Sequence, residues 1–279
     1  MKDFCIGISC VEDLSEGINY YTSLTLKHLD NLKEQGDVFV YTNNVNLFKD
    51  RGINVIPFEG DLLTVENALK LSDAERDSLD LDMIYSTHDK LNIVDYVFNL
   101  GYTGCLILDA DEQLTLESNL ILNKFKKDIP NLEAGFHFLG YWDSFYETQD
   151  EIHFYPQWGH LKKYDYFKAL NDNISFELSN QVKPVRESNF FVRYFDEWDI
   201  FFENTRKYRK IVMKNDLTKF NWEDKKPYRP IGTGEGLSWI VSFNELNLTK
   251  YIHINELMKY LDISIIRHYH PRNDVFYLQ

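Results

Sequence analysis

The chain has 279 residues, of which 44% are hydrophobic, and this composition excludes a protein that is disordered throughout. Its length fits one large α/β domain. The formal net charge of -14 argues against non-specific binding to nucleic acid or to an anionic membrane surface. The acidity is uneven, because residues 183–229 contain 12 Lys and Arg against 8 Asp and Glu. One face of an acidic protein can therefore be basic.

The expected lack of a targeting signal and the pattern of the cysteines both favour a reducing compartment. The N-terminal residues lack a basic segment followed by a long apolar stretch, so we expect no signal peptide. No run approaches the roughly 18 apolar residues that a membrane helix needs, so we expect no membrane span. Cys5 and Cys105 lie in strand-like runs, and with Cys10 they show no metal-type spacing. We therefore expect buried free thiols and a cytoplasmic location.

The first half of the sequence alternates between apolar runs and helical patterns. Apolar runs predict strands at residues 4–9, 37–42, 53–58 and 105–108, and helical spacing predicts helices at 17–32, 64–71 and 86–100. Pro57 limits the third of these strands to the edge or the end of a sheet. This order of elements predicts an α/β fold with a doubly wound, mostly parallel central sheet and flanking helices.

The second half is rich in aromatic residues. Its pattern predicts strands at 134–139, 189–194, 251–254 and 263–266, helices at 197–208 and 237–246, and irregular structure at 141–158. Trp198 and Trp239 fall at helical positions and are expected in the core. Trp142 and Trp158 fall in the irregular region, where they would suit a platform on which a sugar stacks. No linker or repeat divides the chain, so we expect a single domain.

One short motif carries most of the chemical information. The apolar run that ends at Leu108 is followed directly by Asp109, Ala110 and Asp111. Ligands of open α/β sheets bind at the carboxyl ends of the strands, which is where these two carboxylates fall. Hard oxygen donors suit a divalent cation, and such a cation commonly takes substrate phosphates as its other ligands. The motif therefore predicts chemistry on a nucleotide diphosphate.

The stretch from Lys90 through Gly101 to Asp111 resembles the nucleotide-sugar glycosyltransferases of the GT-A fold. These enzymes share the order of helix, glycine-containing turn, apolar strand and Asp-x-Asp motif. The resemblance covers roughly the first half of the chain and a C-terminal pair of histidines. It implies a GT-A-like domain with a nucleotide-sugar-binding half at 1–133. Residues 134–279 would then be an acceptor-binding half that ends in a metal-ligand tail.

The resemblance also implies how the motif binds a metal. Asp109 would contact the ribose, or the metal through water, and Asp111 would ligate the Mn²⁺ or Mg²⁺ that bridges the two phosphates. A histidine near the C-terminus is a further ligand in several such families, which makes His268 and His270 candidates. Alternation along a strand would let only one of them face the site. The alternative is that both lie in a solvated tail.

The family places the nucleotide at the carboxyl ends of the first two strands and beside the motif. The corresponding nucleotide-binding residues are Ser9, Cys10, Val11, Tyr41, Thr42, Asn43, Lys90, Asp109 and Ala110. Ordinary loop chemistry is the alternative for any one of them. Tyr41 would stack on the base or serve as a core aromatic residue. Lys90 would offset phosphate charge or be an exposed helix lysine.

Two glutamates are candidates for catalytic acid or base chemistry. Glu235 lies among glycines just before a predicted helix, where a carboxylate could meet an acceptor hydroxyl. The alternative for Glu235 is a helix cap, because a carboxylate favours the positive end of the helix dipole. Glu187, which precedes Ser188 and Asn189, is the second candidate and would contact the donor sugar.

These features predict a metal-dependent transferase that moves a hexosyl or pentosyl group from a nucleotide-sugar, with UDP as the first nucleotide to test. The hydroxyl acceptor would be a saccharide, or a hydroxymethylated base of phage DNA bound by the basic segment 183–229. A sugar-phosphate nucleotidyltransferase is the alternative, disfavoured because no Gly-rich, basic loop follows the first strand. A third hypothesis is a non-catalytic binding protein on a decayed fold, which Asp109, Asp111 and His270 disfavour.

Overall fold

The computed structural model describes most of the first half of the chain and several separate parts of the second. The described residues are 2–12, 20–58, 61–62, 71–72, 74–75, 78, 84–85, 90–114, 118–138, 142–147, 152–156, 190–219, 235–254 and 266–268. Every structural statement below concerns these residues. The predicted helix at 64–71, save for Leu71, and the candidate site residues Glu187 and His270 fall outside them.

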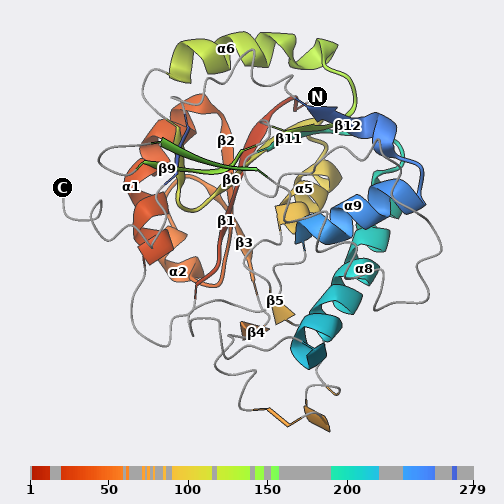
Figure 1. Cartoon of the computed structure of the whole chain (residues 1–279). Helices are drawn as coiled ribbons and strands as arrows, with labels where there is room; N and C mark the ends of the chain where they lie inside the picture. Colours follow the sequence, from red (N-terminus) through yellow and green to blue (C-terminus); the bar gives the residue numbers. More distant parts are fainter. Residues whose placement is uncertain are drawn as a thin grey trace.

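A seven-stranded sheet with the order β12-β8-β11-β6-β1-β2-β3 forms the centre of the protein (Figure 1). Its strands, in chain order, are β1 (Cys5–Cys10), β2 (Asp37–Thr42), β3 (Asn54–Pro57), β6 (Gly104–Asp109), β8 (Gly135–Phe138), β11 (Phe190–Arg193) and β12 (Ile252–Ile254). The strands β6, β1, β2 and β3 are parallel to one another, as β12 is to β8. Only β11 runs antiparallel to its neighbours β6 and β8. The predicted mostly parallel α/β fold is confirmed, with Pro57 at the end of an edge strand.

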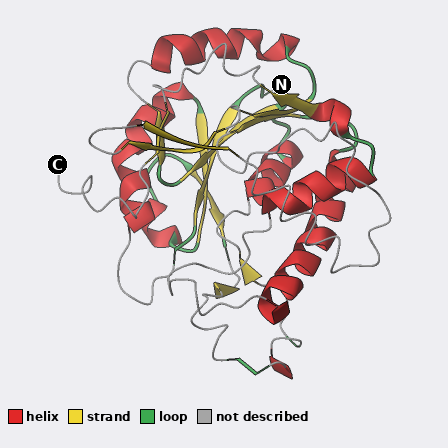
Figure 2. Cartoon of the chain, viewed as in Figure 1, coloured by secondary structure: helices red, strands yellow, loops and turns green. Residues whose placement is uncertain are grey.

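Helices cover both faces of this sheet (Figures 1 and 2). On one face, α1 (Tyr20–Gln35), α2 (Val45–Phe48) and α6 (Ser118–Asp128) pack on a core that includes Leu29 and Phe125. On the other, α5 (Lys90–Asn99), α8 (Trp198–Lys219) and α9 (Glu235–Glu245) pack on a second core. None of the helices in the described parts combines the length and the apolar character needed to cross a bilayer.

Close packing of α5 on the sheet depends on Gly7. A Cβ atom at this position would lie 2.6 Å from Ile93 Cγ2 and 2.7 Å from Ile107 Cδ1. Any larger residue would push α5 away from β1 and β6, because buried side chains leave no room for a methyl group. Glycine in the middle of β1 therefore lets the first turn of α5 approach the end of the sheet.

Aromatic residues of β8, β11, α8 and α9 fill the core beneath α8 and α9. Trp198 and Trp239 are fully buried there, as predicted, and Phe136 of β8 has both rings within 6.1 Å of its own. Trp142 begins a strand, but its side chain lies outside the described atoms, and Trp158 lies outside the described residues. The predicted sugar-stacking platform thus remains a prediction.

Several elements differ from the sequence prediction. The region at 141–158 is not wholly irregular, because β9 (Trp142–Glu147) and β10 (Ile152–Pro156) form an antiparallel pair. The helix α6 and the strand β7 (Glu112–Leu114) were not anticipated. Of the last predicted strand, at 263–266, only Ile266 is described, and it is the first residue of β13 (Ile266–His268). Four other short elements are β4 (Asp61–Leu62), β5 (Ile84–Tyr85), η2 (Ile129–Asn131) and η4 (Thr249–Tyr251).

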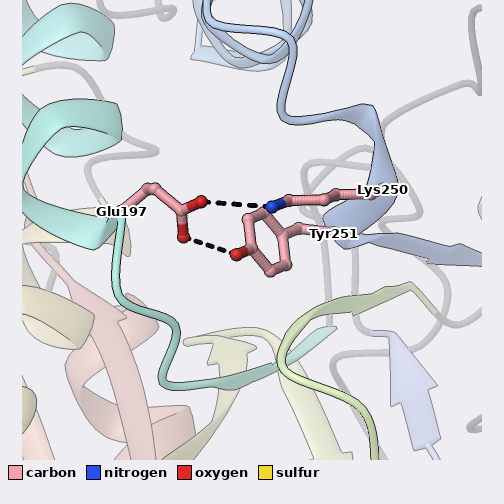
Figure 3. A network of polar contacts seen from close by, with 3 residues as sticks. All are labelled: Glu197, Lys250 and Tyr251. Carbon is pink, nitrogen blue, oxygen red and sulfur yellow. Dashed lines mark hydrogen bonds and ion pairs between the residues drawn. The ribbon is translucent and has the colours of Figure 1, made fainter.

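A polar network fastens the segment before β12 to the start of α8 (Figure 3). The Glu197 carboxylate accepts a hydrogen bond from the Tyr251 hydroxyl and lies 3.2 Å from the Lys250 ammonium. The Tyr251 ring also stacks on Phe195 at 4.5 Å. Gly135 has a φ of 126°, and a Cβ atom there would lie 2.4 Å from the Tyr251 carbonyl oxygen. Only glycine tolerates that backbone, so β8 and this segment can meet closely.

The three cysteines are free and buried, as predicted for Cys5 and Cys105. Burial raises the pKa of Cys10 to about 12 and raises that of Cys5 as well. Since the thiolate is the reactive form, we expect no reaction of the native protein with a thiol reagent at pH 8. The same reagent should count three thiols per chain in denaturant. A thiol that reacts at once in the native state would contradict this burial.

Candidate functional site

The Asp-x-Asp motif begins at the last residue of β6, beside the ends of β1 and β2. The parallel register places Asp109 next to Ser9 of β1, and Ser9 next to Tyr41 of β2. Strand alternation puts all three side chains on the face of the sheet that α5 covers. We call Tyr41, Ser9 and Asp109 the polar row. Three residues predicted from separate strands are therefore brought together.

The first turn of α5 contacts both ends of the polar row. Lys90 Nζ lies 2.7 Å from Asp109 Oδ1, and Asn92 Nδ2 donates a hydrogen bond to the Tyr41 hydroxyl at 3.4 Å. The Lys90 side chain is 0% exposed and that of Asp109 is 16% exposed. The alternative that Lys90 is an exposed helix lysine is therefore wrong. Its ammonium group ends in the protein interior, against the first carboxylate of the motif.

Burial makes this ion pair a strong constraint on the site. Burying an ammonium group costs free energy unless a carboxylate neutralises it. Removing one partner of the pair leaves the other charge buried without its counter-ion. The pair therefore fixes the side chain of Asp109 against the start of α5. Tyr41 is only 8% exposed, and its ring packs edge-on against that of Phe58, with 5.8 Å between the ring centroids. This packing agrees with the alternative that Tyr41 is a core aromatic residue.

The second aspartate of the motif and the glutamate that follows it are also buried. Asp111 is 6% exposed and Glu112 is 5% exposed, and Glu112 Oε2 accepts a hydrogen bond from the Asp109 main-chain N–H at 2.9 Å. Within the described residues, no group of three or more His, Cys, Asp or Glu side chains could hold a metal ion by itself. A cation at this motif would thus need ligands from elsewhere.

The strand order identifies this part of the sheet as a natural binding position. The chain leaves β1 toward β2 on one side, while β6 and the strands that follow lie on the other side of β1. Ligands of doubly wound sheets bind outside the carboxyl ends of the strands where the order reverses in this way. That position is the junction of β1 and β6, and Ser9 and Asp109 flank it.

Four other predicted nucleotide-binding residues have buried side chains. The Cys10 thiol lies among the hydroxyl groups of Thr22 and Thr25 on α1, on the opposite face of the sheet. The others are Val11, Thr42 and Ala110, which are at most 6% exposed. A ligand at this edge would meet their main-chain groups rather than their side chains.

Asn43, the last of the predicted set, joins the ends of β1 and β2. Its amide oxygen accepts a hydrogen bond from the Glu12 N–H at 3.2 Å, and its amide nitrogen donates to the Glu12 carbonyl at 2.7 Å. The Asn43 amide thus bonds both main-chain groups of Glu12, as the backbone of a neighbouring strand would. These bonds continue the pairing of β1 with β2 by one residue.

Sequence reasoning missed two buried glutamates, Glu12 and Glu112. The Glu12 carboxylate caps α1, because it accepts hydrogen bonds from the N–H groups of Tyr21 and Thr22. A capping-box search looks only three residues ahead, and so it does not detect a cap from nine residues upstream. Glu112 had a clearer signal, since it directly follows the motif.

The C-terminal histidines and the candidate catalytic glutamates are only partly described. His268 belongs to β13, which pairs with β7 so that His268 stands opposite Glu112. The backbone of a candidate histidine is therefore next to the motif, while His270 and Glu187 lie outside the described residues. Glu235 is the first residue of α9, and its side chain lies outside the described atoms.

Comparisons with known proteins give only distant likenesses. No family model matches the chain, and no curated protein matches it. A glycosyltransferase involved in the glycosylation of the major capsid of PBCV-1 is 11% identical, with 91% of this chain and 82% of that chain covered and a TM-score of 0.36. Mouse xyloside xylosyltransferase 1 is 8% identical, with 92% and 86% covered and a TM-score of 0.41. The 4-diphosphocytidyl-2C-methyl-D-erythritol synthase of Anaerococcus prevotii is 11% identical, with 88% and 99% covered and a TM-score of 0.31.

Proposed function

We propose that this protein is a glycosyltransferase that binds a nucleotide-sugar, together with Mn²⁺ or Mg²⁺, at the junction of β1 and β6. The sugar would pass to a hydroxyl group of an acceptor. In this proposal Asp111 ligates the cation, while Asp109 lies beside the ribose or a metal-bound water. The polar row and the edge residues from Ser9 to Val11 would meet the nucleotide.

One observation carries this proposal: the buried pair of Lys90 and Asp109 beside Asp111, at the reversal of strand order. Buried charges are expensive to keep, and they are concentrated where proteins do chemistry. Here they stand at the edge where doubly wound sheets bind ligands. If this ion pair served only to stabilise the fold, apolar side chains of similar volume would do so at least as well.

The described residues fit a cation that arrives with its substrate. Asp111 supplies hard oxygen donors, but the described side chains do not form a complete cage. Mg²⁺ in particular is often held by one or two carboxylates and by substrate phosphates. Bound in this way, the cation would neutralise the diphosphate leaving group. His268 and His270 stay candidates for an additional ligand.

Glu12 disfavours the alternative of a sugar-phosphate nucleotidyltransferase. A helix N-terminus after the first strand is a common place for phosphate, because its N–H groups and dipole favour an anion. In this protein the carboxylate of Glu12 already occupies that place on α1, with its oxygens on the N–H groups of Tyr21 and Thr22. A triphosphate would have to displace a buried side chain there.

The acceptor is proposed to be a saccharide. The net charge of -14 would repel a polyanion, unless the basic segment 183–229 overcomes it. A DNA acceptor bound through that segment would show binding at low salt that weakens steeply as salt is added. Absence of binding to duplex DNA at low salt would rule out the DNA alternative. Glu235 is proposed as the residue that meets the acceptor hydroxyl.

A thermal-shift panel of UDP-, GDP-, CMP- and TDP-sugars, with and without Mn²⁺, tests the proposed function. We expect one nucleotide class to raise the melting temperature only when Mn²⁺ is present. At a hundred times its dissociation constant, a ligand of the native state adds about 2.7 kcal/mol. This gain corresponds to a shift of roughly 5 °C or more for a chain of this size.

The variant Asp111→Asn should lose this shift while melting normally without ligand. The matched control is Asp30→Asn, which changes an exposed aspartate of α1 and should keep the full shift. A panel in which no nucleotide acts with either metal would contradict the proposal. So would a full Mn²⁺-dependent shift in Asp111→Asn.

A further inference from the structure

A hydrogen bond to the residue that follows the Asp-x-Asp motif closes the main chain of the motif into a turn. The N–H of Asp109 donates to Glu112 Oε2 at 2.9 Å, so that the side chain three residues ahead returns to the first residue of the motif. Asp109 is the last residue of β6, so this bond gives a carboxylate acceptor to a main-chain N–H at the end of the strand. Asp111 lies inside the loop that this bond closes.

Asp109 is consequently held at two places. Lys90 binds its carboxylate at 2.7 Å, and Glu112 binds its main-chain N–H. The two contacts come from opposite directions along the chain, one from the first turn of α5 and one from the first residue of β7. Held in this way, the main chain between Asp109 and Glu112 has little freedom, and the position of Asp111 is set with it.

The burial of Glu112 shows that this contact is built into the fold. Glu112 is 5% exposed, and β7 is paired with β13 at this residue. A hydrogen bond to an ionised carboxylate is stronger than one between neutral groups. A buried carboxylate that loses a hydrogen-bond donor loses part of its stabilisation, because water does not replace that donor readily. The fold therefore resists any rearrangement that separates Glu112 from Asp109.

We infer that Glu112 is a positioning residue, which sets the turn that presents Asp111 and does so as a hydrogen-bond acceptor rather than as a cation ligand. Its catalytic meaning rests on the proposed function, whereas the positioning itself does not. Active sites require such support, because a carboxylate misplaced by about 1 Å loses most of its effect.

Two substitutions show whether Glu112 acts as a hydrogen-bond acceptor or as a cation ligand. Glu112→Gln keeps an oxygen that can accept from the Asp109 N–H but removes the charge, and Glu112→Met keeps the size but removes the acceptor. NMR hydrogen exchange of the Asp109 amide needs no ligand. We expect exchange to be about tenfold faster or more in Glu112→Met and nearly unchanged in Glu112→Gln. The control Glu34→Gln, at an exposed position of α1, should match the wild type.

The Mn²⁺-dependent thermal shift supplies the second measurement. Glu112→Gln should keep it and Glu112→Met should lose it. Loss of the shift in Glu112→Gln with a protected Asp109 amide would make Glu112 a cation ligand and overturn the inference. Unchanged exchange in Glu112→Met would overturn it as well. If Glu112→Met does not fold, rapid exchange in Glu112→Gln counts against the inference and slow exchange supports it. If the wild type shows no shift at all, the proposed function fails, while the exchange data still decide the positioning.

Discussion

Replacing Lys90 with methionine is expected to lower the free energy of unfolding by about 3–5 kcal/mol. Methionine fills a similar volume, so the loss comes from the charge of Asp109, which stays behind in a site where its side chain is 16% exposed. Urea denaturation followed by circular dichroism measures the change. The same variant should lose the Mn²⁺-dependent thermal shift, because Asp109 is no longer fixed against α5.

Two further variants show whether the buried charge is the cause. Lys33→Met breaks an exposed pair with Asp30 and should cost less than about 1 kcal/mol. The double variant Lys90→Met with Asp109→Asn removes both charges and should recover much of the stability without recovering the thermal shift. A double variant as unstable as Lys90→Met would show that packing, and not the unpaired carboxylate, explains the loss.

Acidification is expected to destabilise the protein through His137. This histidine of β8 is fully buried, and its ring stacks on that of His253 of β12 at 4.6 Å. Its Nε2 atom lies 2.8 Å from the Glu133 carbonyl oxygen. The pKa of His137 is lowered to about 4, chiefly by burial and in smaller part by the nearby His253 and Arg193, while Glu133 acts in the opposite direction.

The sign of the pH effect follows from the lowered pKa. Above about pH 6.5, His137 is neutral in both the folded and the unfolded chain, and it makes no pH-dependent contribution. As the pH falls below 6.5, the unfolded chain takes up the proton first, and stability is lost until the folded pKa near 4 is reached. We expect a loss of about 2 kcal/mol at pH 5 and about 3 kcal/mol at pH 4 from this group.

The variant His137→Gln isolates this contribution, because glutamine does not titrate. Urea denaturation at pH 7.5 and pH 5 should show a smaller loss of stability in His137→Gln than in the wild type, by about 2 kcal/mol. His28 on α1 has a pKa that burial also lowers to about 4, but its side chain is only partly buried. The variant His28→Gln is thus the matched control, with a smaller effect. Equal pH dependence in the wild type and His137→Gln would contradict the assignment.

The sequence was sufficient to predict the elements whose pattern is local. The buried strands β1, β2 and β6 are nearly continuous apolar runs, because both faces of the sheet are covered. The position of Asp109 at the end of β6 followed from the same pattern. Since parallel strands end at one edge, Ser9 and Tyr41 could be grouped with Asp109 before the register was known.

Features that depend on distant partners were not predictable in this way. The range of β11 was close to the prediction, but its antiparallel direction depends on how the chain returns to β6, which no local pattern records. Lys90 has the spacing of an ordinary helix residue, and only the approach of α5 to the sheet buries it. Glu12 and Glu112 bind main-chain N–H groups, which every residue except proline carries, so the sequence does not show which N–H group either carboxylate binds.

The insertion of β11 between β6 and β8 has a consequence for how the protein folds. Phe190 pairs with Ile107, so the motif strand gains its second neighbour from a segment 83 positions later in the chain. Closing such a long loop is slow, and until it closes, a strand that is apolar up to Asp109 presents an unpaired edge. A fragment that stops at residue 133 would keep that edge permanently. We therefore expect the first half of the chain to aggregate when expressed alone, and recovery of the whole protein from denaturant to depend on dilution.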